Sequence, residues 1–303
     1  MAKVHVIESS TWQIGILPET GASSAFGRVR YQDQWRDVMR PTPREKYDSS
    51  SACASFLLVP WSNRIRDGRF RFRGNEYQLR VNSDDGTAIH GVGRKLPWKV
   101  ESATTSSIVC TFDSADFPDI NWPWQFSSRA EFSVAGRDFT MVLSIKNEAS
   151  APFPAGFGHH PYFQRTFAGP QDTVLLQVPC SRSFPLDKAL PTGGPIPIAP
   201  RIDFQQMRPL GDDFIDDVLT GRTYSEPIRF RYTRSDLALE MHADPLFETV
   251  IVYAPVGKDF FAVEPVTNAN DGFNLDDQGI PGSGVFVLEP GQECAGTVTL
   301  SVV

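Results

Sequence analysis

The sequence predicts an all-β protein built as a large antiparallel β-sandwich, and three observations lead to this fold class. First, 24 Pro and 23 Gly are spread over the 303 residues and interrupt the chain too often for long helical periodicity. Second, segments that alternate polar and apolar residues are abundant. Third, these segments follow one another at short spacing with turn residues between them, which is typical of sandwiches.

Individual strands can be placed from this alternation. Residues 69–80 and 131–145 each predict a β-hairpin, because two alternating runs flank a short turn. The apolar runs at 249–253 and 284–288 predict buried strands. Residues 295–303 alternate throughout, so we expect this segment to pair into a sheet.

The chain is expected to form one domain over residues 1–303. Apolar residues make up 41% of it, including 22 Phe and 6 Trp, which is enough for a large core. The Pro-rich stretch 191–200 is short and is interpreted as a surface loop inside that domain. No fixed-period repeat is visible, which argues against a propeller or solenoid.

Charge and cysteine content exclude several classes of protein. A net charge of −7 does not suit a nucleic-acid binder, which needs a dense basic face. The four cysteines form no CxxC pair and no zinc-like cluster, so we expect reduced thiols and no metal site. No run approaches the ~20 apolar residues of a membrane span. With no signal-peptide pattern at the N-terminus, the expectation is a cytoplasmic protein that contacts no membrane.

Histidines are the natural candidates for acid–base chemistry, because there are only five. His159 and His160 precede Pro161 in an extended segment, so their side chains point to opposite faces and only one can face a given pocket. His90 lies between a hydrophobic strand end and Gly91, where its ring can project into a cleft. A structural role for each histidine is the alternative.

Glu264 is the most unusual carboxylate. It ends the apolar run from Phe260, where poor solvation would raise its pKa and suit it to general acid–base catalysis. A Glu that leaves the strand end into water is the alternative. Asp216 is a weaker candidate, since acidic pairs are common in loops. Arg64 could orient a hydroxyl-rich or anionic ligand, although arginines are also usual on solvated strand faces. No P-loop, dinucleotide fingerprint, GxSxG or HExxH motif occurs.

Several segments, read in order, resemble the aldose 1-epimerase (galactose mutarotase) family over about residues 10 to 303. The matching pieces are Asn63-Arg64-Ile65, His90-Gly91 with Trp98 downstream, Asn121-Trp122-Pro123-Trp124, His160-Pro161-Tyr162-Phe163, Asp216-Asp217-Val218, Ala262-Val263-Glu264-Pro265 and Leu288-Glu289-Pro290-Gly291. The resemblance implies a galactose mutarotase-like supersandwich, an isomerase without a cofactor, and a free sugar as substrate.

The resemblance also implies roles for individual residues. Glu264 resembles the general base that takes the proton of the C1 hydroxyl, and His160 the general acid that protonates the ring oxygen. His90 resembles the second histidine near the anomeric centre. Arg64 and Asp216 resemble residues that hold sugar hydroxyls. Trp98 could stack on the sugar, although large aromatic residues usually serve the core.

Pro161 and Pro265 depart from the family's usual residues and resemble its divergent bacterial branch. The alternatives are therefore an epimerase specific for a phosphorylated or sulfonated hexose, for which Arg64, Arg66, Arg69 and Arg94 offer positive charge, and a non-catalytic carbohydrate-binding protein on the same fold. A glycoside hydrolase or lyase would need two flanking carboxylates, whereas only Glu264 has a suitable setting. The oligomeric state is expected to be a monomer or homodimer.

Overall fold

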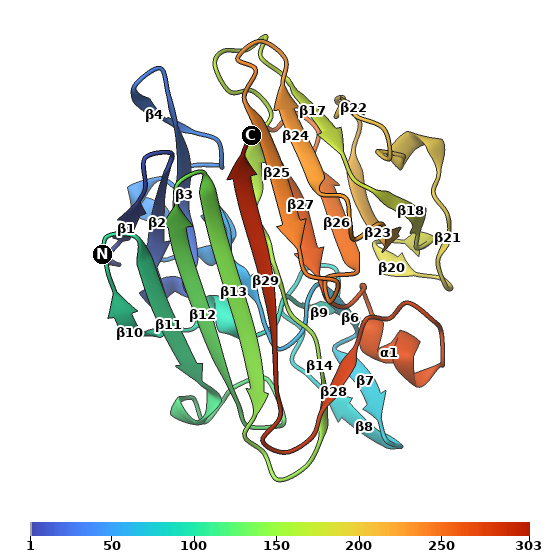
Figure 1. Ribbon diagram of the computed structural model, residues 1–303. Helices are drawn as coiled ribbons and strands as arrows, with labels where there is room; N and C mark the ends of the chain where they lie inside the picture. Colours follow the sequence, from blue (N-terminus) through green and yellow to red (C-terminus); the bar gives the residue numbers. More distant parts are fainter. Residues whose placement is uncertain (1) are drawn as a thin grey trace.

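The predicted all-β fold is confirmed. A computed structural model describes residues 2–303 and consists mainly of strands, and every strand pairing between them is antiparallel (Figure 1). One α-helix, α1 (Gly272–Asp277), occurs within these residues. None of their helices is long and apolar enough to cross a membrane.

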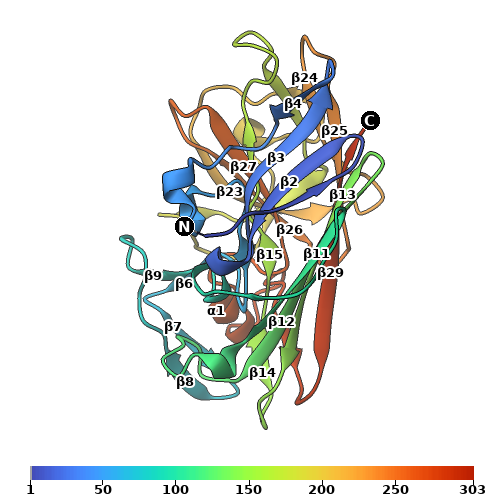
Figure 2. The same cartoon turned by 90° about the vertical axis from the view of Figure 1, so that its left-hand side faces the viewer.

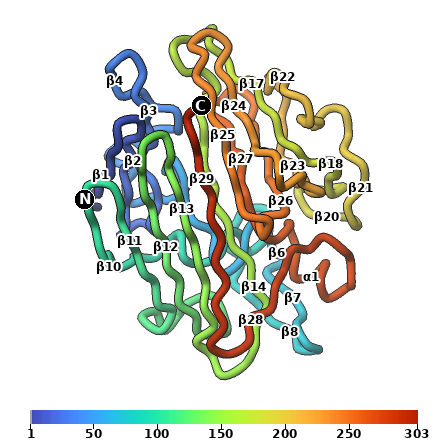
Figure 3. The backbone as a smooth tube through the Cα atoms, viewed as in Figure 1, coloured from blue at the N-terminus to red at the C-terminus, as the bar shows by residue number. Residues whose placement is uncertain are grey.

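The largest sheet has nine strands. Its order across the sheet is β10 (Lys99–Ala103), β11 (Ser107–Asp113), β12 (Phe126–Ala135), β13 (Asp138–Asn147), β29 (Glu293–Val302), β25 (Ala238–Ala243), β24 (Ile228–Tyr232), β17 (Val174–Gln177) and β22 (Arg208–Pro209). The hairpin expected at 131–145 is β12–β13, and the expected strand at 295–303 is β29. β29 runs through the interior of this sheet, between β13 and β25 (Figure 3).

The second sheet faces the first and carries the site described below. Its order is β21 (Ile196–Pro197), β18 (Cys180–Ser183), β23 (Ile215–Arg222), β26 (Thr249–Ala254), β27 (Phe260–Val266), β15 (Gly158–His159) and β5 (Leu57–Leu58). β16 (Tyr162–Gln164) also pairs with β27, which brings the number of strands to eight.

An N-terminal sheet of four strands lies beside these two (Figure 2). Its strands are β1 (His5–Glu8), β2 (Trp12–Leu17), β3 (Ser23–Tyr31) and β4 (Gln34–Asp37). Isolated bridges from Ser24 to Ser55 and from Met39 to Phe163 attach it to the second sheet.

Short strand pairs complete the fold. They are β6 (Arg64–Arg66) with β9 (Thr87–Ile89), β7 (Arg69–Phe72) with β8 (Asn75–Gln78), β14 (Phe153–Ala155) with β28 (Phe286–Leu288), and β19 (Leu186–Asp187) with β20 (Leu190–Pro191). The hairpin expected at 69–80 is β7–β8, and most of the strand expected at 284–288 is β28.

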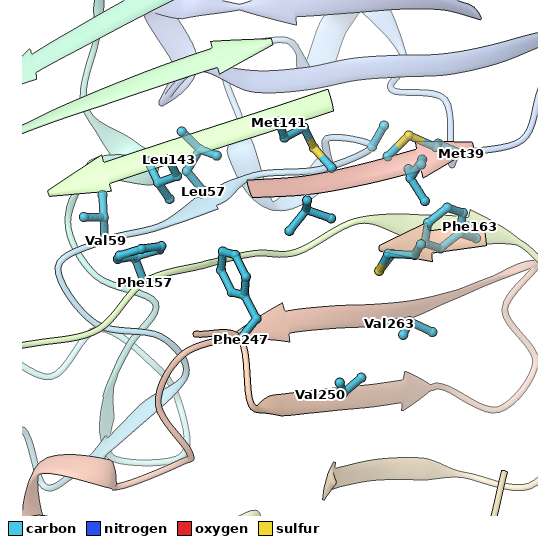
Figure 4. Packing of buried hydrophobic residues seen from close by; sticks show 14 of the residues in the cluster. Met39, Leu57, Val59, Met141, Leu143, Phe157, Phe163, Phe247, Val250 and Val263 are labelled. Carbon is cyan, nitrogen blue, oxygen red and sulfur yellow. The ribbon is translucent and has the colours of Figure 1, made fainter. Parts of the chain in front are cut away.

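The main core fills the space between the two large sheets (Figure 4). Met141 and Leu143 project from the nine-stranded sheet, and Val250 and Val263 from the opposing one, with Phe247 between them. Burial of a side chain of this size stabilises the fold by about 1.5–3 kcal/mol. Cys53, Cys110, Cys180 and Cys294 are all free thiols, as predicted.

The alternation of side chains along β26 and β27 gives the second sheet two different faces. Val250, Val252 and Val263 belong to the main core, whereas Ile251 and Ala262 belong to a separate cluster on the opposite face. Glu264 is in register with Ile251 across the two strands, so it lies on that opposite face. The candidate site is built there.

Candidate active site

Three segments distant in sequence meet where the site forms. β15 pairs with both β5 and β27, so residues near 57, 158 and 264 become neighbours. The His160 backbone N–H donates to the Phe56 carbonyl at 3.0 Å, and the Tyr162 N–H donates to Ala54 at 2.8 Å. These backbone hydrogen bonds fix the position of the His160 backbone and therefore of its Cβ.

His159 and His160 point to opposite faces of their segment, as the extended backbone predicts. The His159 ring lies 6.0 Å from the ring of Phe247, which belongs to the main core. The His160 ring packs on both Phe56 and Tyr162, with centroid distances of 4.4 and 4.5 Å. His160 is therefore the histidine that faces the cluster around Glu264.

His160 and Glu264 are in direct contact. His160 Nε2 lies 3.1 Å from Glu264 Oε1, and both side chains are buried. His160 Nδ1 and Glu264 Oε2 have no hydrogen-bond partner within residues 2–303. A buried polar atom without a partner is costly, so a hydrogen bond from a ligand to either atom would be stabilising.

Burial dominates the ionisation of this pair. It lowers the pKa of His160 well below its usual range, and the charges of Arg94 and Arg40 lower it further. It raises the pKa of Glu264 well above its usual range, and the Asp216 carboxylate adds to that rise. Both shifts disfavour the charged form of each group, so burial favours a pair that carries one transferable proton and no net charge.

His90 completes the imidazole group. It follows β9, and its backbone has a φ of 63° while its N–H donates to the Asn63 carbonyl at 2.9 Å. Its ring meets the His160 ring edge to face at 5.3 Å, and its Nδ1 has no partner in the described chain. Burial, with Arg94 and His160 nearby, lowers the pKa of His90 well below its usual range.

Arg64 and Asp216 lie at the Glu264 side of the site. β6 pairs with β9, which places Arg64 opposite Ile89, directly before His90. Arg64 Nη2 is 3.7 Å from Asp216 Oδ2, and Arg64 Nε donates to Asp85 at 2.8 Å. Burial raises the pKa of Asp216, and the charge of Arg64 opposes that rise.

Trp98 is not brought together with these five residues. It is 3% exposed and belongs to the main core, where it packs on Phe112 at 5.4 Å. Its Nε1 donates to the Gly93 carbonyl at 2.9 Å. Because the ring is covered and its one polar atom is satisfied, we leave Trp98 out of the site proposed below.

The structure adds five residues that sequence reasoning missed or did not assign to this site. Phe56 and Tyr162 flank His160, Tyr253 is in register with Asp216, and Arg40 and Arg94 lie on the flanking aromatic rings. Two of them stood in segments that the sequence had singled out, Tyr162 two residues after His160 and Arg94 four residues after His90.

No three His, Cys, Asp or Glu side chains between residues 2 and 303 are arranged to hold a metal ion. A cavity of about 540 Å³ lies beside the site, where it touches Gly91 and Val92 and is otherwise lined mainly by residues 80–82 and 116–121. It does not include His160 or Glu264.

The two facing sheets define the galactose mutarotase-like class of fold. A galactose mutarotase-like protein from Clostridium acetobutylicum superposes with a TM-score of 0.88 at 16% identity, covering 100% of this chain and 95% of that one. A GalM/aldose epimerase homologue from C. elegans gives a TM-score of 0.85 at 16% identity, covering 100% and 99%.

The chain belongs to the aldose 1-epimerase family, whose model matches residues 26–301. The resemblance predicted from the sequence is thereby confirmed. The curated protein YphB of Escherichia coli (strain K12) is 24% identical over 312 residues, which cover 99% of this chain and 98% of YphB.

Proposed function

We propose that this protein is a mutarotase, an isomerase that interconverts the α and β anomers of a free aldose. The observation that carries the proposal is the buried contact of 3.1 Å between His160 Nε2 and Glu264 Oε1. Mutarotation needs a base at the C1 hydroxyl and an acid at the ring oxygen. These two oxygens are bonded to the same carbon, so an acid and a base this close together suit the reaction.

The reaction follows from moving one proton at each oxygen. Glu264, as carboxylate, takes the proton of the C1 hydroxyl while His160, as imidazolium, gives its proton to the ring oxygen. The C1–O5 bond breaks and leaves an open-chain aldehyde. Rotation about C1–C2 presents the other carbonyl face, and both proton transfers reverse on closure. Each positioned transfer contributes about 10²–10⁴ in rate.

The surrounding residues have supporting roles in this proposal. His90, edge to face with His160, donates a hydrogen bond near the anomeric centre. Arg64 and Asp216 hold sugar hydroxyls at the Glu264 side. The one transferable proton of the His160–Glu264 pair must lie on His160 for the forward step, and the pair keeps zero net charge in either arrangement.

NMR exchange spectroscopy across a panel of aldoses tests the proposal. The wild type is expected to accelerate anomer exchange of at least one aldose, and His160→Ala and Glu264→Gln are expected to lose at least about 10²-fold. His242→Ala is the matched control, because the His242 side chain is exposed on β25, where it is paired with Glu240. Tight sugar binding without acceleration would instead identify a carbohydrate-binding protein.

A further inference from the structure

Two arginines at the His160 side of the site have no carboxylate partner. Arg40 donates from Nη2 to the carbonyl oxygens of Ser51, at 2.9 Å, and Cys53. Arg94 donates from Nη1 to Ser51 Oγ at 3.1 Å. The two guanidinium groups therefore converge on one residue. Neither forms an ion pair within residues 2–303, and the Nε of each is buried without a partner.

Their burial makes this arrangement unusual. Arg94 is 6% exposed and Arg40 is half-buried. Burial lowers the pKa of both guanidinium groups, and the field of Asp259 partly opposes this for Arg40. A buried charge without a counter-ion is destabilising, and a bound anion would remove that cost.

Both arginines lie next to the proposed catalytic histidine. The Arg94 guanidinium carbon is 5.2 Å from the Phe56 ring centroid, and that of Arg40 is 3.7 Å from the Tyr162 centroid. Phe56 and Tyr162 are the two aromatic rings that pack against His160. Each guanidinium group is thus one aromatic ring away from His160.

Charge is distributed unevenly along the site. At the Glu264 side, Arg64 is balanced by Asp85 and Asp216. The charges that shift the pKa of Glu264 are those of Asp216 and Arg64. The charges that shift the pKa of His160 are mainly those of Arg94 and Arg40. The His160 side therefore carries an excess of positive charge.

The other arginines that the sequence offered for an anion are already paired. Arg66 contacts Asp271 at 3.2 Å, and Arg69 contacts Glu76 at 3.6 Å on an exposed hairpin. Arg94 is the one member of that set without a carboxylate in the described chain. This leaves Arg94, joined by Arg40, as the pair that can neutralise a ligand.

Two surface hollows adjoin these arginines. One, of about 530 Å³, is lined by Arg40 and Lys46, and the other, of about 520 Å³, by Arg94 and Lys95. They share Ser49 and Ser51. Glu19 and Asp48 also line the second hollow, and both are exposed there.

We propose that Arg40 and Arg94 form a subsite for an anionic group on C6 of the sugar, so that the substrate is an anionic aldose. This rests on the proposed mutarotase function. In a pyranose the ring oxygen is bonded to C1 and C5. With His160 at the ring oxygen and Glu264 at C1, C5 and its substituent C6 extend away from Glu264. C6 therefore points toward the His160 side of the site, where the guanidinium groups of Arg40 and Arg94 lie.

The test compares anomer exchange of glucose, glucose 6-phosphate, 6-deoxy-6-sulfoglucose and glucuronate, after subtraction of the enzyme-free rate for each. We expect kcat/KM for at least one anionic sugar to exceed that for glucose by about 10- to 100-fold, the size of a charge-assisted hydrogen bond. The three anionic sugars distinguish a phosphate, a sulfonate and a carboxylate as the group bound.

Variants assign the preference to the subsite. Arg94→Met is expected to lower the ratio of anionic to neutral kcat/KM by about 10-fold or more, and Arg94→Lys to retain part of it. Arg71→Met removes one exposed charge on the distant hairpin and should leave the ratio unchanged. Because Arg40 also holds the 51–53 backbone, Arg40→Met is judged only if its melting temperature matches the wild type.

Calorimetric titration of the same sugars separates this inference from the proposed function. If no sugar exchanges faster but glucose 6-phosphate binds and Arg94→Met abolishes that binding, the mutarotase proposal fails and the subsite stands. If neutral and anionic sugars exchange equally well, or Arg94→Met lowers both equally, the subsite proposal is wrong and the mutarotase proposal stands.

Discussion

His160 Nε2 lies 3.1 Å from Glu264 Oε1, with both side chains buried, and this contact predicts the pH dependence of catalysis. The active form holds one transferable proton on the pair. At low pH the pair binds a second proton, and at high pH it loses its single transferable proton. Both forms are inactive, so kcat/KM should follow a bell-shaped profile.

Burial, together with Arg94 and Arg40, sets the acid limb of that profile. Because these lower the pKa of His160, the acid limb should lie well below pH 6.5, the value for free histidine. Replacement of Arg94 by Gln removes a positive charge that lowers this pKa, so the limb should move to higher pH. A wild-type acid limb at or above pH 6.5 would contradict the assignment.

Arg64 should act through binding. It lies 3.7 Å from Asp216 and 2.8 Å from Asp85, so its guanidinium group is held on two sides. Arg64→Met should raise KM about 10- to 100-fold, the effect of losing a charged hydrogen bond to the sugar.

Asp85 holds the Arg64 guanidinium group in place, so its replacement serves as the comparison for Arg64→Met. Burial would raise the pKa of this carboxyl, but hydrogen bonds from Arg64 and Thr87 outweigh it and lower the pKa to about 2. Asp85→Asn should therefore raise KM less than Arg64→Met does and leave kcat close to the wild-type value. Steady-state kinetics of both variants checks this order, and an equal or larger effect of Asp85→Asn would refute it.

Much of the fold was predictable because its cause is local. Alternation and turn residues located the 69–80 and 131–145 hairpins, and the extended backbone before Pro161 predicted that His159 and His160 face opposite ways. The apolar run before Glu264 predicted a buried carboxylate, and Glu264 is 1% exposed.

The rest of the site depends on pairings between distant segments. Phe56 and Arg40 become neighbours of the site around His160 only when distant segments such as β5, β15 and β27 pair, and no local pattern encodes that register. Trp98 was expected at the sugar because aromatic residues suit both a sugar face and a core. Its satisfied Nε1 and its packing on Phe112 place it in the core.

Gly91 should be essential for positioning His90. It has a φ of 65°, and an added Cβ would lie 2.0 Å from the Val59 carbonyl oxygen. Gly91→Ala should therefore lower the melting temperature and the activity. Gly74→Ala is the matched control, because its φ is 81° but nothing lies within 4 Å of its Cβ. Gly74→Ala should lower the free energy of unfolding by only the ~1–2 kcal/mol that a left-handed backbone costs a residue with a Cβ. Equal losses of stability in the two variants would argue against a close contact at Gly91.

His159 should make the fold sensitive to acid. Burial lowers its pKa to about 3, and neither ring nitrogen has a partner within residues 2–303. An unfolded histidine has a pKa near 6.5, so between these values the unfolded state binds more protons and stability falls as the pH falls. Between these two pKa values, His159 should lower the free energy of unfolding by up to about 1.4 kcal/mol for each pH unit of acidification.

His159→Leu isolates that contribution. Urea unfolding at pH 7.5 and pH 5 should show the variant gaining stability relative to the wild type as the pH falls. His242→Leu is the control, because it makes the same substitution at an exposed histidine. A constant difference between the His159 variant and the wild type at the two pH values would show that the buried ring does not have the lowered pKa.

The position of β29 inside the nine-stranded sheet constrains the order of events on the ribosome. β13 and β25 lie on its two sides, and they are separated from each other by about ninety residues of chain that is synthesised earlier. Until residues 293–302 have left the exit tunnel, both neighbours present an unpaired edge that can associate with other chains. The nine-stranded sheet can therefore be completed only after residues 293–302 are available to pair with both neighbours.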